Sequence, residues 1–478
     1  MLPYPTPLVR QVFPGLCIDK TRLPASGLKE AGVPSFVAEW LLDKMVPGEG
    51  PLQPEAFAQV TRFVDQAFPR KDDSNVIRYD LIQGNVRKLI ALLKVYIPPE
   101  DGKGQIPEPI AQIPVLNFNK CRISRDLIDA NKMLLRQGVW GKISLGMQSD
   151  GMPEILDFEP FQCSSVDLGL YNHCRSRFTT DQWRDLLICS MGYNPENPAY
   201  TVTAKTWMLA RLLPLVERNF SIMELAPKGT GKSYVFENIS SKVALISGGK
   251  VTPAQLLFNG KTKEVGLLGR HDVVVLDEVQ SLSFDNPDEV IGPLKNYLAS
   301  GRYNRAGFAP IASDCSLVML ANIELDRELK PRYAQHLLAN LPEFLSETAF
   351  LDRFSGIIPG WKIPKFNRDR IASQVGLKMD FFGEALLSLR RDSRFLAYAQ
   401  AHTEFHTATI RDQNAILSSA TGFLKILYPH LQLTVADFDR DCLQPACQLR
   451  QYIHNSLYYL DEEFRQHGPT IHAEATAS

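Results

Sequence analysis

The chain has 478 residues, of which 45% are hydrophobic and 22% charged, and its net charge is −1. This length has room for roughly two to four globular domains. The near-neutral charge excludes a global polycation, so a surface for nucleic acid would have to be local. No run of about 18 apolar residues could span a membrane, and the N-terminus lacks a signal-peptide pattern. The eight cysteines form no Cys-x-x-Cys pair. We therefore expect a cytoplasmic protein with reduced thiols and no membrane partner.

Residues 1–93 are predicted to form a helical domain. Apolar side chains recur at helical spacing in 33–45, 54–67 and 80–93. In the last of these segments four residues are expected to share one buried helix face: Leu81, Val86, Leu89 and Leu93.

Residues 94–170 have a different texture, with helix-breaking prolines and short apolar alternations in 115–119, 140–145 and 155–161. We predict a small β-rich domain with an interrupting helix at 124–137. A barrel of the oligonucleotide-binding (OB) type is compatible with this pattern but not demanded by it. Residues 61–136 carry 13 Lys/Arg against 9 Asp/Glu. Such a bias is typical of a solvated face or of a nucleic-acid footprint, and both remain open.

The segment 226–233, Ala-Pro-Lys-Gly-Thr-Gly-Lys-Ser, follows an apolar run and nearly matches the phosphate-binding loop G-x-x-x-x-G-K-[ST]. Glycines in such a loop let backbone N–H groups converge on phosphate oxygens. Lys232 would reach the β- and γ-phosphates of ATP, and the Ser233 hydroxyl would hold Mg²⁺. A glycine-rich turn without a ligand is the alternative. The predicted nucleotide-binding residues are Ala226 (in place of the first glycine), Pro227, Lys228, Gly229, Thr230, Gly231, Lys232, Ser233 and Tyr234.

Two further apolar runs end in polar residues, 273–276 before Asp277 and Glu278, and 316–321 before Asn322. The carboxyl ends of buried parallel strands are where α/β sheets place ligands. Asp277 is expected to hold Mg²⁺ through water, and Glu278 to orient and deprotonate the attacking water. Asn322 is expected to contact that water or the γ-phosphate.

Five apolar segments alternate with helical ones, which predicts a parallel five-stranded α/β core with the ligand at its strand tips, over residues 171–365. The expected strands are 221–226, 243–247, 273–277, 316–321 and 357–361. Beyond the core we predict a helical lid over 366–465 and a flexible tail over 466–478.

Two arginines are candidates for stabilising transition-state charge. Arg353 lies 31 residues after Asn322. In a ring ATPase an arginine here would project into the neighbouring subunit's site as an arginine finger. A surface salt bridge is the alternative. Arg411 stands just ahead of an apolar helical face and could close over the γ-phosphate; a solvated arginine is its alternative.

Taken together, these motifs resemble the AAA+ superfamily. The segment 294–307 resembles the pre-sensor hairpin of the MCM replicative helicases. That resemblance implies that Arg302, Tyr303 and Arg305 face a nucleic-acid strand in a ring's channel, where arginine and an aromatic ring suit backbone and base. An exposed turn without a ligand is the other interpretation.

Several longer phrases resemble one family, BrxL, the Lon-related AAA+ proteins of BREX phage-defence systems. They lie at 33–42, 178–187, 231–235, 245–249, 350–354 and 428–430. The resemblance implies a DNA-binding ATPase that uses ATP and Mg²⁺, forms a homo-hexameric and possibly paired ring, and acts with other BREX proteins in the bacterial cytoplasm.

About 50 residues follow Pro429, so we expect this chain to lack the Lon-like protease domain and protease activity. Two alternatives stay open. One is a protein-remodelling ATPase that works with a separate protease, with 256–260 as its channel loop. The other is a scaffold whose assembly is controlled by nucleotide.

Overall fold

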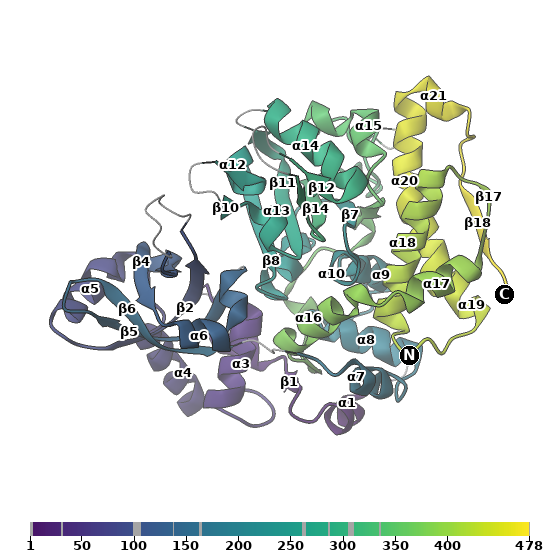
Figure 1. Cartoon of the computed structure of the whole chain (residues 1–478). Helices are drawn as coiled ribbons and strands as arrows, with labels where there is room; N and C mark the ends of the chain where they lie inside the picture. The colour runs from purple at the N-terminus through teal and green to yellow at the C-terminus, as the bar shows by residue number, and fades with distance from the viewer. Residues whose placement is uncertain are drawn as a thin grey trace.

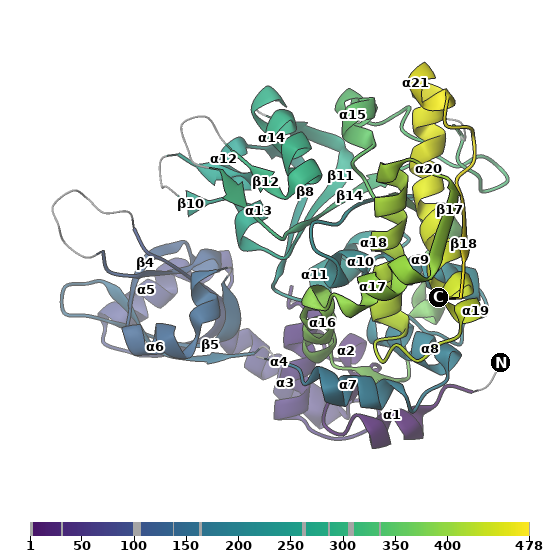
Figure 2. The same cartoon turned by 45° about the vertical axis from the view of Figure 1, so that its right-hand side comes forward.

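The computed structural model describes residues 3–477, apart from 30–31, 99–106, 137, 162–164, 261–263, 285–286, 305–309 and 334–335. Figure 1 shows a small barrel beside a larger α/β body. In Figures 1 and 2 the C-terminal helices cover the side of that body away from the barrel. Within the described residues, no helix is long and apolar enough to cross a membrane.

The body is built on a five-stranded sheet in which every pair of neighbours is parallel. Its order is β15-β7-β14-β11-β8. The strands are β7 (Ser221–Ala226), β8 (Val243–Val251), β11 (Val273–Phe284), β14 (Ser316–Asn322) and β15 (Gly356–Pro359). All five predicted strands are confirmed.

Helices cover both faces of this sheet. Along β11, Val273 and Val275 belong to one buried cluster, which also holds residues of α9 (Val202–Ala210) and α10 (Leu213–Val216). Val274 and Leu276 belong to a second cluster with α13 (Leu267–Arg270) and α14 (Pro287–Ser300). Burial on both faces explains why residues 273–276 of β11 are uniformly apolar rather than alternating.

The barrel is closed, with strand order β2-β3-β4-β6-β5. Its strands are β2 (Arg87–Tyr96), β3 (Ile110–Ile113), β4 (Phe118–Ile123), β5 (Val139–Met147) and β6 (Pro153–Pro160). The expected interrupting helix is present but shorter, as α6 (Arg125–Ala130) and a 3₁₀ turn at Lys132–Leu135. The strand expected at 115–119 begins later, at Phe118, because Pro114–Leu116 forms another 3₁₀ turn.

The helix predicted over 80–93 is wrong. Helix α5 (Ser74–Ile82) ends before Gly84, whose φ is +81°, and strand β2 follows. Leu89 and Leu93 are buried as expected, but inside the barrel, whereas Val86 is 54% exposed. Two residues four apart lie on one face of a helix and also on one face of a strand, so the apolar spacing could not separate the two.

The first part of the chain is not a separate helical domain. The predicted helices appear as α3 (Ser35–Met45) and α4 (Pro54–Ala67), but buried residues from Tyr4 to Val46 belong to the cluster that fills the body. Strand β1 (Cys17–Asp19) pairs antiparallel with β16 (Val375–Leu377), which follows the sheet in sequence. The predicted boundary at 93/94 falls inside β2.

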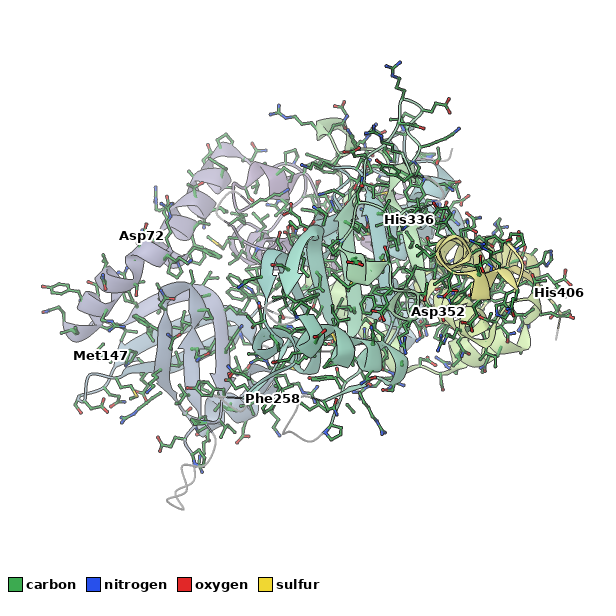
Figure 3. The ribbon with its side chains drawn as sticks, turned by 90° about the horizontal axis from the view of Figure 1, so that it is seen from above. Asp72, Met147, Phe258, His336, Asp352 and His406 are labelled. Atoms are coloured by element: carbon green, nitrogen blue, oxygen red, sulfur yellow. The ribbon has the colours of Figure 1, made fainter. Side chains whose placement is uncertain are left out.

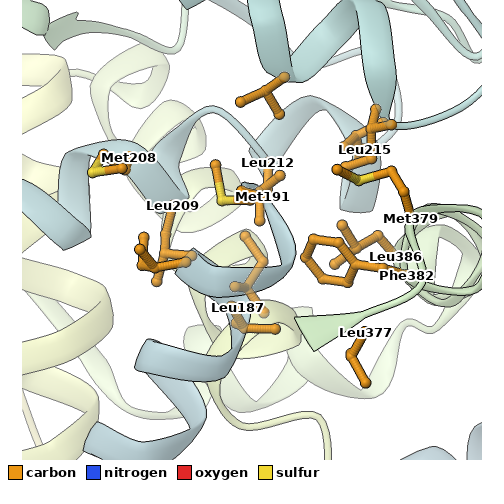
Figure 4. Packing of buried hydrophobic residues seen from close by; sticks show 14 of the residues in the cluster. Leu187, Met191, Met208, Leu209, Leu212, Leu215, Leu377, Met379, Phe382 and Leu386 are labelled. Atoms are coloured by element: carbon orange, nitrogen blue, oxygen red, sulfur yellow. The ribbon is translucent and has the colours of Figure 1, made fainter. Parts of the chain in front are cut away.

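Buried leucine, methionine and phenylalanine side chains from several segments pack together in the core of the body, as Figure 4 shows. Leu187 comes from α8 (Thr180–Ser190), Leu215 from α10, and Phe382 and Leu386 from α16 (Met379–Ser388). A capping box between Thr179 and Gln182 begins α8.

The region after the sheet is mostly helical, as predicted, and α18 (Ile410–Leu427) ends two residues before Pro429. The tail differs from the prediction: β18 (His472–Ala475) pairs with β17 (Thr403–Thr407). The other elements are α1 (Thr6–Val12), α2 (Arg22–Ala25), α7 (Leu168–Arg175), α11 (Lys232–Asn238), α12 (Pro253–Leu256), β9 (Phe258–Asn259), β10 (Glu264–Val265), α13 (Leu267–Arg270), α14 (Pro287–Ser300), β12 (Arg302–Tyr303), β13 (Ile311–Ala312), α15 (Thr348–Leu351), α17 (Arg394–Ala401), α19 (Val435–Phe438), α20 (Gln444–Leu460) and α21 (Glu462–Arg465).

Candidate nucleotide-binding site

The loop between β7 and α11 needs its glycines. Gly229 and Gly231 have φ of +85° and +72°, a left-handed conformation that favours glycine. A Cβ on Gly231 would also lie 2.7 Å from the Tyr193 hydroxyl oxygen. The loop can therefore present backbone groups to a ligand without side chains in the way.

Ala226 does not require glycine's freedom. It is the last residue of β7, paired in register with Asn322 of β14, and its carbonyl accepts a hydrogen bond from the N–H of Ile323 at 3.1 Å. Its side chain is fully buried next to Gly360, where an added Cβ would lie 2.4 Å from the Ala226 Cβ. The methyl group of Ala226 fits because its neighbour, Gly360, has no side chain.

The structure brings Lys232 and Asn322 together. The Lys232 ammonium donates to the Asn322 Oδ1 at 2.6 Å, and the Asn322 backbone N–H donates to Gln280 Oε1 at 3.1 Å. Lys232 is only 8% exposed, and burial lowers its pKa. A partly desolvated ammonium held by a neutral amide is suited to receive an anion such as phosphate.

Ser233 and Asp277 also meet, as their predicted roles require. The Ser233 hydroxyl donates to Asp277 Oδ2 at 2.6 Å, and the other carboxylate oxygen accepts the Glu278 backbone N–H at 2.8 Å. The described residues contain no group of three or more His, Cys, Asp or Glu placed to share a metal ion. This donor set fits Mg²⁺, which commonly takes one or two protein oxygens and completes its shell with waters and phosphates.

Glu278 has an unusual backbone. Its φ is +52°, and the pairing of β11 with β8 is irregular between Asp277 and Leu282. A non-glycine residue in this region costs about 1–3 kcal/mol, and such residues cluster at functional sites. The irregularity turns the Glu278 side chain outward into solvent while Asp277 stays buried.

A buried ion pair supports the loop from below. The Arg211 guanidinium donates to both carboxylate oxygens of Glu224 at 2.6 and 2.9 Å, and to the Thr230 carbonyl at 3.3 Å. The Tyr193 hydroxyl donates to the Gly231 carbonyl at 3.1 Å. Sequence reasoning missed these residues, although a glutamate inside the apolar strand β7 was a signal, since a buried carboxylate needs a cation.

The side chain of Tyr234 does not lie at the loop's open side. Its ring centroid lies 6.5 Å from that of Phe366, the Lys29 ammonium stands 4.6 Å over the ring, and its hydroxyl is 3.4 Å from Ser35 Oγ. Tyr234 thus joins the nucleotide loop to α3. Pro227 is half-buried and Lys228 exposed at the mouth of the loop.

Arg353 and Arg411 lie at the other edge of the sheet. Ser355 donates its N–H to the Ser221 carbonyl at 2.7 Å, so the turn carrying Arg353 meets β7 at its first residue. The loop follows the last residue of β7, five steps or about 16 Å away at ~3.3 Å per residue. Arg411 is ion-paired with Asp352, so the structure does not bring it over the loop of its own chain.

Asp352 lies between the sheet and the C-terminal helices, as Figure 3 shows. Besides Arg411 it binds Arg450 of α20, which also binds Asp412 of α18. Burial would raise the pKa of Asp412, but hydrogen bonds from His454 and Arg450 hold that pKa well below its usual range. These ion pairs anchor Asp352, the residue directly before Arg353.

The predicted hairpin is partly confirmed. Arg302 pairs with Ala312 across β12 and β13, and Arg302 is exposed. Tyr303, however, is 2% exposed, packs edge-on against Tyr297 and has its pKa raised by burial, so its expected contact with nucleic acid is wrong. Residues 294–300 belong to α14 rather than to the hairpin. Arg305 lies outside the described residues.

Comparison with known proteins decides the family. Residues 154–470 match the family model "Lon-like protease BrxL-like, ATPase domain", and residues 11–147 match "BREX system Lon protease-like protein BrxL N-terminal". This chain belongs to the BrxL family. The resemblance found in the sequence is confirmed.

Two BrxL relatives align with most of the chain. The "Lon-like protease BrxL" of Escherichia coli O9:H4 (strain HS) is 30% identical over 94% of this chain and 64% of its own length. That of Bacillus cereus (strain H3081.97) is 30% identical over 84% and 59%. The chain therefore spans less than two thirds of these two BrxL proteins. A shorter match, 28% identical over 38% of the chain, is to "Uncharacterized protein ORF426" of Acidianus filamentous virus 1, of which it covers 48%.

Proposed function

We propose that this chain is a ring-forming ATPase of the AAA+ type that binds DNA and acts in BREX-type phage defence. The observation that carries the proposal is the convergence of two polar pairs at the carboxyl edge of the sheet. Lys232 meets Asn322, and Ser233 meets Asp277, at 2.6 Å each. This geometry occurs in a segment that matches a BrxL ATPase domain.

The loop and Lys232 would hold the phosphates of ATP. Backbone N–H groups around Gly229 and Gly231 would bind the phosphate oxygens, and Lys232 would exchange its bond to Asn322 for the β- and γ-phosphates. Ser233 and Asp277 would hold Mg²⁺, which neutralises charge on the phosphate oxygens when bound.

Glu278 would act as the base. Its outward-turned carboxylate would accept a proton from the water that attacks the γ-phosphate. Asn322, once released from Lys232, would orient that water while Gln280 keeps its backbone in place. Proton removal and positioning then come from two adjacent strands, β11 and β14.

Arg353 and Arg411 would act on a neighbouring subunit. Both lie at the amino edge of the sheet, away from their own loop, so they would reach a nucleotide only across an interface. A homo-hexameric ring, single or paired, would bring the amino edge of one sheet to the loop of the next. In that arrangement the arginines would stabilise the charge of phosphoryl transfer in trans.

DNA is the proposed substrate of the ring, with Arg302 and Arg305 of the hairpin as contacts and the closed barrel as an OB-like module. The names of the matched families support a role beside other BREX proteins. The alternative, a protein-remodelling ATPase, is less well supported. Leu256 and Leu257, expected in its channel loop, are fully buried.

The test is ATP hydrolysis by the purified chain alone, with single-stranded DNA, with duplex DNA and with an unfolded protein, with the oligomeric mass measured in each case. Stimulation or assembly by DNA would support the proposal and identify the strand form. Stimulation by unfolded protein alone would favour the remodelling ATPase. Nucleotide-dependent assembly without hydrolysis would favour a scaffold.

A further inference from the structure

A cavity of about 890 Å³ separates the barrel from the α/β body. One wall comes from β2 and the 3₁₀ turn at Lys132–Leu135, and the other from α13 and the base of the β12–β13 hairpin. Figures 1 and 2 show these elements facing one another, and Figure 3 shows Phe258 of β9 on the side of the body nearest the barrel.

Positive charge converges in this cleft from both walls. Five of its cationic side chains form no hydrogen bond or ion pair with any residue that the structure describes: Lys94, Arg136, Arg270, Arg302 and Arg391. A sixth, Lys242, is held by Glu384 at 2.6 Å. The three acidic lining residues are Glu264, Asp272 and Asp314, and Asp314 is ion-paired with Arg218.

Two buried nitrogens beside the cleft lack a partner in the described part of the chain, and one of them, Arg270 Nε, is always a donor. Among the described residues, neither Arg270 Nε nor His271 Nδ1 has a hydrogen-bond partner. Burial lowers the pKa of Lys94, and Arg270 lowers it further. The pKa of His271 is lowered to about 4, chiefly by burial and further by the positive charges of Lys94 and Arg270. An unpaired buried donor and like charges held together both cost free energy, and an anion bound beside Lys94 and Arg270 would lower both costs.

We propose that this cleft binds a DNA strand by its phosphates, with Lys94 and Arg270 as the principal contacts. The inference rests on the proposed DNA-binding function and gives it a site that the hairpin alone does not supply. Lysine and arginine are the usual partners of phosphate oxygens, and Tyr96 on the same wall offers a ring on which a base can stack. Arg302 lies at the cleft's edge, so a strand that contacts the hairpin continues between barrel and body.

The cleft also adjoins the catalytic strand. His271 and Asp272 directly precede β11, and the same strand carries Asp277 and Glu278. Phosphates bound at the start of β11 thus contact the strand that carries Glu278, the proposed catalytic base. We expect DNA to stimulate hydrolysis through this cleft while basal hydrolysis does not depend on it.

The experiment measures binding of a labelled thymidine oligonucleotide, and of a duplex, as a function of salt. The variant is Lys94→Gln with Arg270→Gln. The control is Lys120→Gln with Arg465→Gln, which removes the same charge from exposed positions outside the cleft. For a single strand, loss of two phosphate contacts should reduce the salt slope by about 1.4, at ~0.7 per contact. Binding should weaken roughly tenfold or more, and DNA stimulation of hydrolysis should be lost with basal hydrolysis unchanged.

The outcomes separate this inference from the proposed function. Wild-type protein that binds neither DNA form would remove both. Wild-type binding with an unchanged affinity and slope in the cleft variant would overturn the cleft alone, as would an equal loss in the control.

A second measurement does not depend on the variant folding. Acetylation of Lys94 in the wild-type chain is followed by mass spectrometry with DNA, with inorganic phosphate at the same phosphate concentration, and without either. Protection by DNA only is expected. Protection of Lys94 by neither DNA nor phosphate would overturn the strand-binding cleft. Protection by phosphate as well as by DNA would also overturn it, and would indicate a site for small anions instead.

Discussion

Arg450 and Asp352 form a buried ion pair, with 2.5 Å between Nη2 and Oδ1, that ties helix α20 to the turn carrying Arg353. The same guanidinium donates from Nε to Asp412 Oδ1 at 2.7 Å and from Nη1 to the Phe354 carbonyl at 2.6 Å. One side chain thus joins α18, α20 and the amino edge of the sheet. The C-terminal helices α18 and α20 therefore help to hold the turn that carries Arg353, the arginine proposed to act across a subunit interface.

Replacing Arg450 with methionine should destabilise the chain strongly. The change leaves Asp352 and Asp412 buried without their main cation, and such a loss costs about 3–5 kcal/mol. Urea denaturation would measure the free energy of unfolding. The control is Arg465→Met, whose exposed pair with Glu462 should contribute at most about 1 kcal/mol. Equal, small effects of the two changes would show that the buried network is not required for stability.

Glu278→Gln should bind ATP normally and hydrolyse it about 10²–10⁴-fold more slowly, because the amide cannot accept the proton of the attacking water. Nucleotide binding and steady-state phosphate release would be measured on the same sample. Glu328→Gln, at an exposed position paired with Lys330, serves as the matched control. Near-normal turnover by Glu278→Gln would remove this residue from the role of base.

Gly360→Ala should disturb the nucleotide loop by overpacking it. The new Cβ would lie 2.4 Å from the Ala226 Cβ, and overpacking of this kind costs about 1–3 kcal/mol. Adding Ala226→Gly removes that contact and should recover part of the lost stability and ATP affinity. The recovery is expected to be partial, because the Leu225 carbonyl also lies within 2.9 Å of the new atom. No recovery in the double variant would locate the strain elsewhere.

The position of Arg353 predicts complementation between inactive subunits. Arg353→Ala and Glu278→Gln should each abolish most hydrolysis in a homogeneous ring. If the arginine acts in trans, an equal mixture contains interfaces with one intact partner from each variant, and about one quarter of the sites should be active. Hydrolysis by subunit-exchanged mixtures measures this fraction. Activity no higher than that of either variant alone would place Arg353 and Glu278 in the same site or leave Arg353 without a role.

Asp380→Asn should change how stability depends on pH. Burial raises the pKa of Asp380 to about 6, above its unfolded value near 4, so the folded chain favours the protonated acid. Wild-type stability contributed by this group is greatest below pH 4 and is lost as pH rises to about 6. The asparagine keeps an acceptor for the Phe381 N–H and has no such loss. Above pH 6 the variant should be more stable by up to about 3 kcal/mol, measured by urea denaturation across pH. Parallel pH profiles would contradict this.

The α/β core could be predicted because buried parallel strands leave a distinct pattern. In β11 and β14 an apolar run, over 273–276 and 317–321, leads directly to a polar residue at the ligand edge, so strand identity and site residues were visible together. The meeting of Ser233 and Asp277 followed from the geometry of such sheets, whereas the hydrogen bond of Lys232 to Asn322 was not predicted. The residues that support the loop were not predicted either, because the spacing of Arg211 and Glu224 in the sequence does not reveal their contact.

The errors came from patterns that two structures share. Leu89 and Leu93 are four residues apart, a spacing that places two side chains on one face of a helix and equally on one face of a strand. Residues 80–93 therefore fit a helix pattern although strand β2 forms there. The resemblance to the MCM hairpin predicts Tyr303 in the channel beside Arg302, but neighbours in a strand point to opposite faces, and the tyrosine faces inward. Arg411 is predicted to close over a γ-phosphate, and the sequence does not reveal the ion pair with Asp352 that holds it at the amino edge of its own sheet.

Because β1 pairs with β16, the larger body contains segments that precede the barrel in sequence as well as segments that follow it. The barrel is therefore an insertion within that body. Lys20 beside β1 donates to the Leu377 carbonyl at 2.8 Å and to Glu39 at 2.6 Å, and all three residues are buried. A fragment cut at residue 154, where the family's ATPase domain begins, would divide one core and leave β16 as an open edge. Excision of the barrel from within the chain, with its flanks rejoined, would instead leave that core whole.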